Sequence, residues 1–284
     1  MSRQIALLSI DNQNDFMRPN GALYVPDAEN TVDPIVNLID RLIKTIGSIR
    51  STLDSHHRFH ISTPPWFKNS NGDHPDPFTL IRFNNNRIES YDPVTGDDTG
   101  EWFCSIPSTT QWTQEYLQKL AADGRYPHCI WNPHCEIGTP GHAVEENIYA
   151  AFMRWAEANY ATIDWETKGS NYRVEHFSAV KAQVVDPTDP STDTNTSLIK
   201  AIMENDEVLV VGQAWNFCLA NTVIDMHDFA GDEFARKVVL LTDCTSEIEG
   251  ASGEFKALTQ EFMDRMTKAG MRSMKSTEYM KFGS

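Results

Sequence analysis

The sequence predicts an α/β protein in which a mostly parallel sheet lies between two layers of helices. Short apolar runs, such as residues 5–10 and 207–211, have the composition of strands that are buried on both faces. Stretches with helical spacing separate these runs over most of the chain, and strands that alternate with helices are typical of a parallel sheet covered on both sides. We therefore expect a three-layer α/β/α architecture and a single domain over residues 1–284.

The composition argues against several classes of protein. The net charge of −16 disfavours nucleic acid or an anionic membrane surface as a partner, because phosphate contacts need clustered Lys and Arg. No apolar run has the length of a membrane-spanning helix, and the first residues lack the pattern of a signal peptide. Five widely spaced cysteines do not suggest a disulfide framework. We expect a cytoplasmic protein.

The first expected strand, residues 5–10, ends in Asp11. Asp11 thus lies at the carboxyl edge of the sheet, where open α/β sheets bind ligands. It is either a site residue or a turn residue that caps a neighbour. The apolar stripe over 31–48 predicts the first crossover helix, and a weak strand over 49–53 follows it.

The next chemical signal is Asp54-Ser-His56-His-Arg-Phe-His60, directly after this second strand. Asp and His side chains suit Zn²⁺ or a similar ion. Two residues that leave a strand end in an irregular turn, here Asp54 and His56, can converge on one ion. The alternative is a surface cluster of histidines.

Residues 61–126 are predicted to form a long, loop-rich insertion within the domain. Pro, Asn, Gly and Asp dominate this stretch, and only residues 113–122 are expected to form a short helix. A stretch of this length without strong periodicity is usually an insertion near a functional site. It is too irregular to predict a second domain.

The second half of the chain brings two more polar residues to the expected edge of the sheet. His134 precedes a turn built on Gly138, Pro140 and Gly141, and Lys168 follows a predicted strand. The alternative for Lys168 is a solvated surface lysine. Helices are predicted over 142–158, 197–204 and 254–269, and strands over 161–165, 207–211, 237–243 and 272–279.

Cys218 is a candidate nucleophile. It follows the strand 207–211 and the stop at Gly212, and it begins a stretch of helical spacing. A thiol near a helix N-terminus lies at the positive end of the helix dipole, which favours the thiolate. The alternative is a small buried apolar residue, since free cysteines are among the most buried residues.

Taken together, these segments resemble the nicotinamidase (pyrazinamidase) branch of the isochorismatase-like cysteine hydrolases. The resemblance runs from residue 5 to about residue 226, and its motifs occur in the order that is usual for the family. The matching motifs are Asp11-x-Gln13-x-Asp15-Phe16, Asp54-x-His56 with His60-Ile61-Ser62, Trp131-x-Pro133-His134-Cys135 with Gly138-Thr139-Pro140-Gly141, Lys168-Gly169 with Phe177-Ser178-Ala179, and Gly212-x-Ala214-x-x-x-Cys218.

The resemblance implies the isochorismatase-like hydrolase fold and a catalytic triad. Cys218 would attack an amide carbonyl, and the resulting thioester would be cleaved by water. Asp11 would accept the thiol proton and pass it to the leaving ammonia, while Lys168 would hold both groups by its charge. The family builds its oxyanion hole from the backbone N–H groups that correspond to Ala214 and Cys218, next to a cis peptide bond, here Gln213–Ala214.

The resemblance also implies one divalent metal ion, for which we expect Zn²⁺. Asp54, His56 and His134 would hold the ion, and the ion would bind the pyridine nitrogen and orient the ring. His60 is a candidate fourth ligand, or a group that orients a metal-bound water. Phe16, Trp131 and Phe177 correspond to residues that wall the ring, with ordinary core packing as the alternative.

The implied reaction is the hydrolysis of nicotinamide to nicotinic acid and ammonia, a reaction of NAD salvage. The partner would be a small-molecule amide, and a homo-oligomer is compatible with the sequence. The alternative is a related cysteine hydrolase that acts on another small amide or an N-carbamoyl compound, because the insertion over 61–126 is long and the residues before Cys218 are bulky. A non-catalytic binding protein would not need the complete triad.

Overall fold

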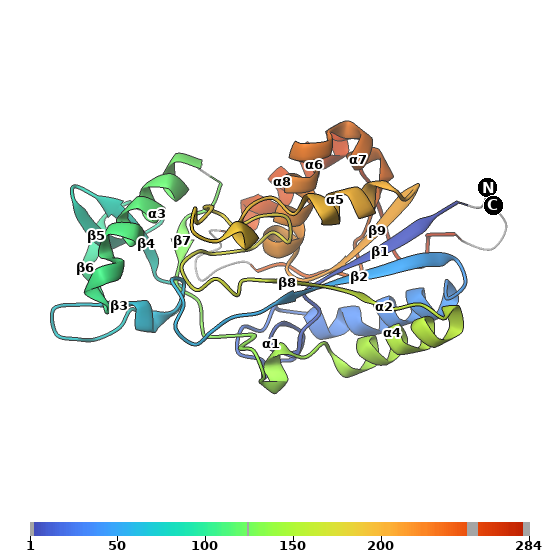
Figure 1. Cartoon of the computed structure of the whole chain (residues 1–284), viewed down its shortest axis with the longest axis horizontal. Helices are drawn as coiled ribbons and strands as arrows, with labels where there is room; N and C mark the ends of the chain where they lie inside the picture. The colour runs from blue at the N-terminus through green and yellow to red at the C-terminus, as the bar shows by residue number, and fades with distance from the viewer. Residues whose placement is uncertain (1–2, 124, 249–254, 281–284) are drawn as a thin grey trace.

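The structure of the protein is a computed structural model that describes residues 3–123, 125–248 and 255–280. Its centre is a six-stranded parallel sheet between two layers of helices (Figure 1). The strands of this sheet, in spatial order, are β11 (Arg272–Met274), β10 (Val238–Leu241), β9 (Glu207–Gly212), β1 (Ile5–Ile10), β2 (Ile46–Asp54) and β8 (Asp164–Lys168).

The two central strands are mostly apolar, as their position requires. Every residue of β1 and of β9 is buried, because helices cover both faces of the sheet at its middle. The two strands pair in parallel from Ile5 opposite Glu207 to Ile10 opposite Gly212. Their carboxyl ends therefore lie next to each other.

Helices form one layer on each face of the sheet (Figure 1). Trp155 of the lower layer is buried and donates its indole N–H to the carbonyl of Ile46, at the start of β2. The lower layer contains α2 (Val32–Arg41) and α4 (Glu146–Asn159), with the short α1 (Asn14–Met17) near the end of the sheet, and the upper layer contains α5 (Thr196–Met203), α6 (Ala220–Ala230), α7 (Asp232–Lys237) and α8 (Lys256–Ala269).

The direction in which strands are added reverses between β1 and β9. The chain passes from β1 to β2 and β8 on one side, and then from β9 to β10 and β11 on the other. The loops that leave β1 and β9 therefore diverge and open a crevice at the carboxyl edge of the sheet, which is the usual ligand site of such folds.

Several element boundaries differ from the sequence prediction. The helix predicted over 31–48 ends at Arg41, and β2 begins at Ile46, because residues 46–54 pair with β1 on one side and β8 on the other. The strand predicted over 161–165 is β8 and ends at Lys168 itself.

The other differences are smaller. The helix predicted over 142–158 begins at Glu146, because residues 140–142 form a 3-10 turn and the Glu145 carboxylate caps the helix by accepting from two backbone N–H groups. The strands predicted over 237–243 and 272–279 are shorter, and the start predicted for the last helix, residue 254, lies outside the described residues.

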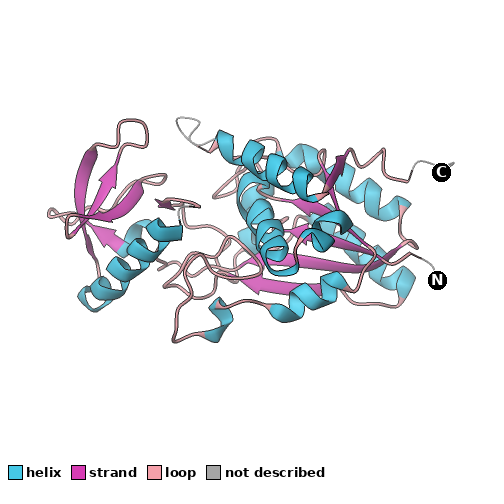
Figure 2. Cartoon of the chain, turned by 90° about the horizontal axis from the view of Figure 1, so that it is seen from above, coloured by secondary structure: helices cyan, strands magenta, loops and turns pink. Residues whose placement is uncertain are grey.

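The prediction of a loop-rich insertion over 61–126 is wrong in its secondary structure. This stretch contributes most of a five-stranded antiparallel sheet, which lies beside the parallel sheet in Figure 2. We call residues 67–129 the antiparallel unit. In spatial order its strands are β3 (Phe67–Lys68), β6 (Asp98–Cys104), β5 (Arg87–Tyr91), β4 (Leu80–Asn84) and β7 (His128–Cys129), and α3 (Thr110–Asp123) packs on them.

The antiparallel unit packs around a second hydrophobic cluster, to which residues outside the unit, such as Trp66 and Val174, also contribute. Trp66, Ile81 and Tyr116 are among the buried residues of this cluster, which is separate from the core of the large sheet. The hairpin between β4 and β5 turns at Asn85 and Asn86, which have φ values of 48° and 61°. Asn tolerates positive φ better than most residues, which suits this tight turn.

The segments that lead into and out of the antiparallel unit meet beside the carboxyl edge of the large sheet. The backbone N–H of Trp131 donates to the carbonyl of Ser62 at 2.7 Å, and His128 contacts the carbonyl of Ile61 through Nε2 at 3.1 Å. Within the described residues, no helix is long and apolar enough to cross a membrane.

Candidate active site

The structure brings Asp11, Lys168 and Cys218 together at the carboxyl edge of the large sheet. Asp11 follows β1, Lys168 is the last residue of β8, and Cys218 lies in a π-helical turn, Trp215–Leu219, just after β9. The ammonium nitrogen of Lys168 is 2.9 Å from Asp11 Oδ2 and 3.6 Å from Cys218 Sγ. All three side chains are buried.

Neighbouring groups fix Asp11 and Lys168. The backbone N–H of Asp11 donates to Thr52 Oγ1 at 3.0 Å, and the Thr52 hydroxyl donates to Asp11 Oδ1. Lys168 Nζ also contacts Asp54 Oδ1 at 2.9 Å and the carbonyl of His176 at 3.1 Å. The ammonium of Lys168 therefore contacts two carboxylates and the sulfur.

The turn that carries Cys218 depends on a close approach of two strands. Gly212 has a φ of 115°, and a Cβ atom on it would lie 1.9 Å from the carbonyl oxygen of Ile10. Only glycine fits there without a backbone shift. The peptide bond between Gln213 and Ala214 is cis, as the resemblance implies, and Ala214 is buried beside the turn.

The buried surroundings of Cys218 affect the acidity of its thiol. Burial raises the pKa of the Cys218 thiol well above its usual value, and the charges of Asp11 and Asp54 act in the same direction, while Lys168 opposes them. Burial also raises the pKa of Asp11. The dipole of one short turn therefore does not offset the effect of burial on the pKa of this thiol.

Lys168 stays charged in these surroundings. Burial acts to lower the pKa of its ammonium, but the carboxylates of Asp11 and Asp54 raise the pKa well above its usual value. The site thus contains a fixed positive charge between a candidate base and a candidate nucleophile.

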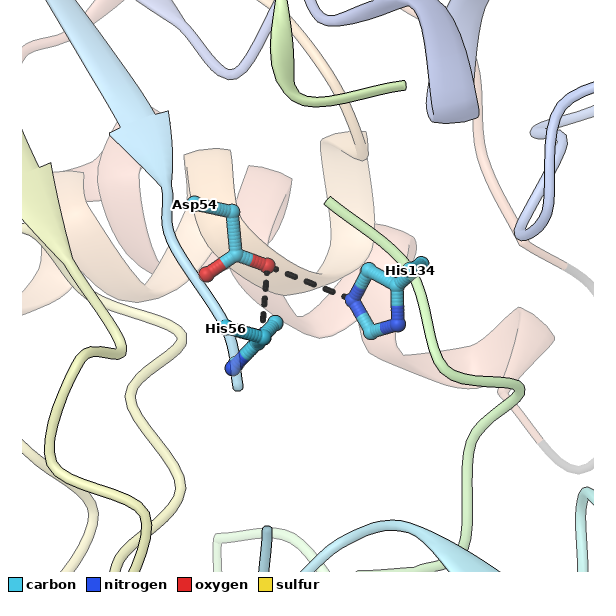
Figure 3. A group of neighbouring side chains, drawn as sticks. All are labelled: Asp54, His56 and His134. Atoms are coloured by element: carbon cyan, nitrogen blue, oxygen red, sulfur yellow. Dashed lines mark hydrogen bonds and ion pairs between the residues drawn. The ribbon is translucent and has the colours of Figure 1, made fainter. Parts of the chain in front are cut away.

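Asp54, His56 and His134 form a group that fits a metal ion (Figure 3). Asp54 Oδ2 lies 3.0 Å from His56 Nε2 and 3.3 Å from His134 Nε2, and one ligand atom from each residue lies within 4.8 Å of the others. His134 Nδ1 is 2.7 Å from the carbonyl of Asn132, so the ring donates there and its Nε2 lone pair faces Asp54. Two imidazoles and a carboxylate are a donor set that suits Zn²⁺.

The backbone of Asp54 is held by Gln13, a residue to which the sequence analysis gave no role. The Gln13 side chain is fully buried, accepts from the Asp54 N–H at 2.7 Å and donates to the Asp54 carbonyl at 2.8 Å. A Cβ atom on Gly169 would lie 2.9 Å from Asp54 Oδ1, so glycine is also required beside this carboxylate.

His60 lies next to the metal-binding group, with its ring centroid 4.6 Å from that of His56. Its Nδ1 accepts from the backbone N–H of Ser62 at 3.2 Å, so the neutral ring carries its proton on Nε2. That buried Nε2 has no hydrogen-bond partner among the described residues. An N–H group cannot ligate an ion, and this tautomer therefore favours a donor to a metal-bound water over a fourth ligand.

A small cavity connects the metal-binding group to the sulfur. Phe16, Trp131 and Phe177, which the sequence analysis named as wall residues, line it together with His134 and Cys218. The Trp131 ring centroid lies 6.3 Å from that of Phe177, and the Phe16 centroid lies 5.3 Å from that of His134.

Glu175 also lines this cavity, although no sequence motif predicted a role for it. Its side chain is buried and accepts from the N–H of His176 at 2.8 Å. A carboxylate seven residues after Lys168 in an irregular segment has no motif of its own in the sequence. Glu175 can be recognised as a pocket residue only in the structure, where its segment lies over the pocket.

No protein-family model matches the chain. The chain is 25% identical over 246 residues to a curated nicotinamidase of Saccharomyces cerevisiae, which covers 85% of this chain and 88% of that protein. It is 23% identical over 230 residues to a nicotinamidase of Schizosaccharomyces pombe, covering 79% and 77%.

Solved structures of nicotinamidases and pyrazinamidases share the fold. Yeast nicotinamidase Pnc1p bound to the inhibitor nicotinaldehyde has a TM-score of 0.60 at 20% identity, covering 96% of this chain and all of that one. A nicotinamidase–pyrazinamidase of Acinetobacter baumanii has a TM-score of 0.59 at 22% identity, covering 98% and 99%. The pyrazinamidase of Pyrococcus horikoshii in complex with zinc has a TM-score of 0.52 at 17% identity, covering 96% and 99%. The predicted α/β fold is thereby confirmed.

Proposed function

We infer that the chain is a nicotinamidase of the isochorismatase-like superfamily, an amidase that hydrolyses nicotinamide to nicotinic acid and ammonia. One observation carries this function: Lys168 contacts Asp11, Cys218 and the metal-binding residue Asp54 in a single buried site. The curated proteins that the chain resembles over most of its length support the same reaction.

Cys218 is the nucleophile in this proposal. Its sulfur forms a bond to the amide carbonyl carbon while the thiol proton passes to Asp11, whose carboxylate contacts the same Lys168 ammonium as the sulfur. The backbone N–H groups of Ala214 and Cys218 stabilise the oxyanion. The C–N bond then breaks, Asp11 returns the proton to the leaving nitrogen, and ammonia departs from a thioester.

Water completes the reaction. It attacks the thioester carbonyl while Asp11 takes a proton from it, and the C–S bond breaks to release nicotinic acid and restore the thiol. Lys168 keeps a positive charge beside both groups throughout, which stabilises the sulfur when it carries negative charge. Phe16, Trp131 and Phe177 wall the pyridine ring.

Asp54, His56 and His134 would hold one divalent ion, and the zinc complex of the Pyrococcus horikoshii pyrazinamidase supports Zn²⁺. When bound, the ion supplies a Lewis-acid position for the ring nitrogen. The buried Nε2–H of His60, which has no hydrogen-bond partner among the described residues, would be available to donate to a water on the ion. The predicted single domain, cytoplasmic location and homo-oligomer remain predictions.

A related hydrolase for another small amide or an N-carbamoyl compound is not favoured, since both curated relatives described above are nicotinamidases. Ammonia release from nicotinamide, pyrazinamide and an N-carbamoyl amine by the zinc-loaded enzyme tests the choice. We expect the highest kcat/KM for nicotinamide, no activity for Cys218→Ala, and normal activity for Cys104→Ala, which removes a buried thiol in the antiparallel unit. A zinc-loaded wild type without activity on nicotinamide would contradict the proposal.

A further inference from the structure

The segment that leads from the antiparallel unit back to the catalytic pocket contacts the turn of the nucleophile directly. We call residues 125–131 the return segment. Tyr126 is buried, and its hydroxyl donates to the carbonyl of Asn216 at 2.7 Å, two residues before Cys218. Its ring centroid lies 5.3 Å from that of Phe217, the residue that precedes Cys218.

Arg125 holds the helix that follows the same turn. Its guanidinium lies 2.7 Å from Asp225 Oδ1, 3.2 Å from Asp228 Oδ2 and 3.4 Å from Asn221 Oδ1, all on α6. The Asp225 side chain is only 2% exposed, and Arg125 lies nearer to its buried charge than Lys181, whose Nζ is 3.9 Å from the same oxygen. Asn221 in turn donates to the carbonyl of Phe217 at 2.9 Å.

The two contacts fix the backbone on both sides of the nucleophile. Tyr126 reaches the carbonyl of Asn216, and Arg125 reaches that of Phe217 through Asn221. A π-helical turn is wider than an α-helical one and is uncommon without outside support. The distance of 3.6 Å between Cys218 Sγ and Lys168 Nζ depends on how this turn is oriented.

We propose that Arg125 and Tyr126 are positioning residues for Cys218, which makes the antiparallel unit part of the catalytic scaffold. The kinetic part of this inference rests on the proposed function, because it uses nicotinamide as substrate. The orientation of the sulfur can also be tested without that substrate, through its reaction with an alkylating reagent.

Tyr126→Phe tests the proposal, because it keeps the ring and removes only the hydroxyl. We expect kcat for nicotinamide to fall about tenfold, since small misplacements of a reacting group cost that much or more, while KM changes by less than about twofold. The rate of Cys218 alkylation by iodoacetamide, followed by mass spectrometry of its peptide, should also change by more than about threefold. Metal content should stay at the wild-type value.

Tyr160→Phe is the matched control, because Tyr160 is 98% exposed and remote from the return segment; it should leave all three readouts unchanged. Arg125→Lys is the second variant and decides the matter if Tyr126→Phe does not fold. It keeps the charge beside Asp225, but its single nitrogen cannot reproduce the Nη1 contacts with Asp225 and Asn221 together with the Nη2 contact with Asp228. We therefore expect the same lowered kcat at an unchanged KM.

Wild-type kcat and wild-type alkylation rate in a folded variant would overturn the proposal. If the wild type itself released no ammonia from nicotinamide, the proposed function would fail, and the alkylation rates alone would decide whether Arg125 and Tyr126 orient the sulfur.

Discussion

The ammonium of Lys168 lies between the carboxylates of Asp11 and Asp54, at 2.9 Å from each. One of these carboxylates belongs to the proposed triad and the other to the metal-binding group. Burying a charge is costly unless it is paired, and here one cation is shared by two anions. The chemistry of the sulfur and the binding of the ion are therefore coupled through a single side chain.

Gln13 provides a prediction at this scale, because it holds the backbone of Asp54 through two hydrogen bonds. Gln13→Leu removes both bonds and leaves the Asp54 N–H and carbonyl buried. Loss of a group that orients a metal ligand typically costs about 10–100-fold in metal affinity. We expect a loss of that size, measured by competition with a zinc chelator.

The exposed Gln111 offers the control for this experiment. Gln111→Leu removes an exposed side chain that hydrogen-bonds Glu115 on the surface of α3, so zinc affinity should stay at the wild-type value. Equal zinc affinity of Gln13→Leu and the wild type would show that the two hydrogen bonds from Gln13 to the Asp54 backbone have no effect on the metal-binding group.

Most of the site could be predicted because its chemistry requires particular residue types at strand ends. Asp11, Lys168 and Cys218 each follow or end a strand, and the structure brings them within contact of one another. Gln13 and Glu175 were not predicted as functional, since neither type is diagnostic and their contacts are made across more than 40 residues or through an irregular loop.

At the scale of elements, β7 shows how the two sheets are joined. Its first residue, His128, is buried between the rings of Phe67 and Tyr116, with centroids 6.0 Å and 5.4 Å away. The imidazole contacts the carbonyl of Ile61 through Nε2, so the neutral ring donates from that nitrogen. The antiparallel sheet is thereby hydrogen-bonded to the segment that contains His60.

His128 makes the stability of the protein depend on pH. Burial lowers the pKa of His128 to about 4, below the value near 6.5 in the unfolded chain. Between these two values the unfolded state binds more protons. The stability is therefore complete above about pH 6.5 and falls by up to about 3 kcal/mol as the pH decreases through this window towards 4.

His128→Gln keeps a donor for Ile61 and does not titrate. Urea unfolding at several pH values should show a smaller loss of stability between pH 6.5 and 4 than in the wild type. His74→Gln, an exposed change in the same unit, should retain the wild-type slope. Identical slopes for His128→Gln and the wild type would contradict the assignment.

The antiparallel unit was the largest error of the sequence analysis, and its cause is local. β3 and β7 have only two residues each, and the strands between them are short and carry charges such as Glu89, which is buried against Arg82 and Arg87. Strands that are this short and contain buried charges do not show the alternation of apolar and polar residues by which a strand is recognised in a sequence. The signal that could have identified the hairpin is Asn85-Asn86 between two short runs of β-forming residues.

At the scale of the whole molecule, the metal-binding group draws its ligands from two distant segments. Asp54 and His56 leave β2, while His134 follows the return segment of the antiparallel unit. An ion held by both stabilises the folded state, because the unfolded chain does not bring the ligands together.

Removal of the metal should therefore lower stability as well as activity. We expect a chelator to lower Tm and abolish ammonia release, and Zn²⁺ to restore both. Zinc at 100 times its Kd should add about 2.7 kcal/mol to the free energy of unfolding. Differential scanning calorimetry with metal analysis provides the measurement. His56→Ala serves as the control, since its Tm should respond little to zinc; a wild-type Tm that ignores both chelator and zinc would argue against the site.

The meeting of the two ends of the antiparallel unit, at Ile61–Ser62 and His128–Trp131, has a consequence for how such an enzyme could be shortened. A trimmed chain that skipped from one end to the other would keep every residue of the triad. It would nevertheless lose Tyr126, which holds the turn of Cys218, and Phe78, whose ring packs against Trp131 in the wall of the small cavity. A compact descendant would have to rebuild that wall from a different stretch of chain.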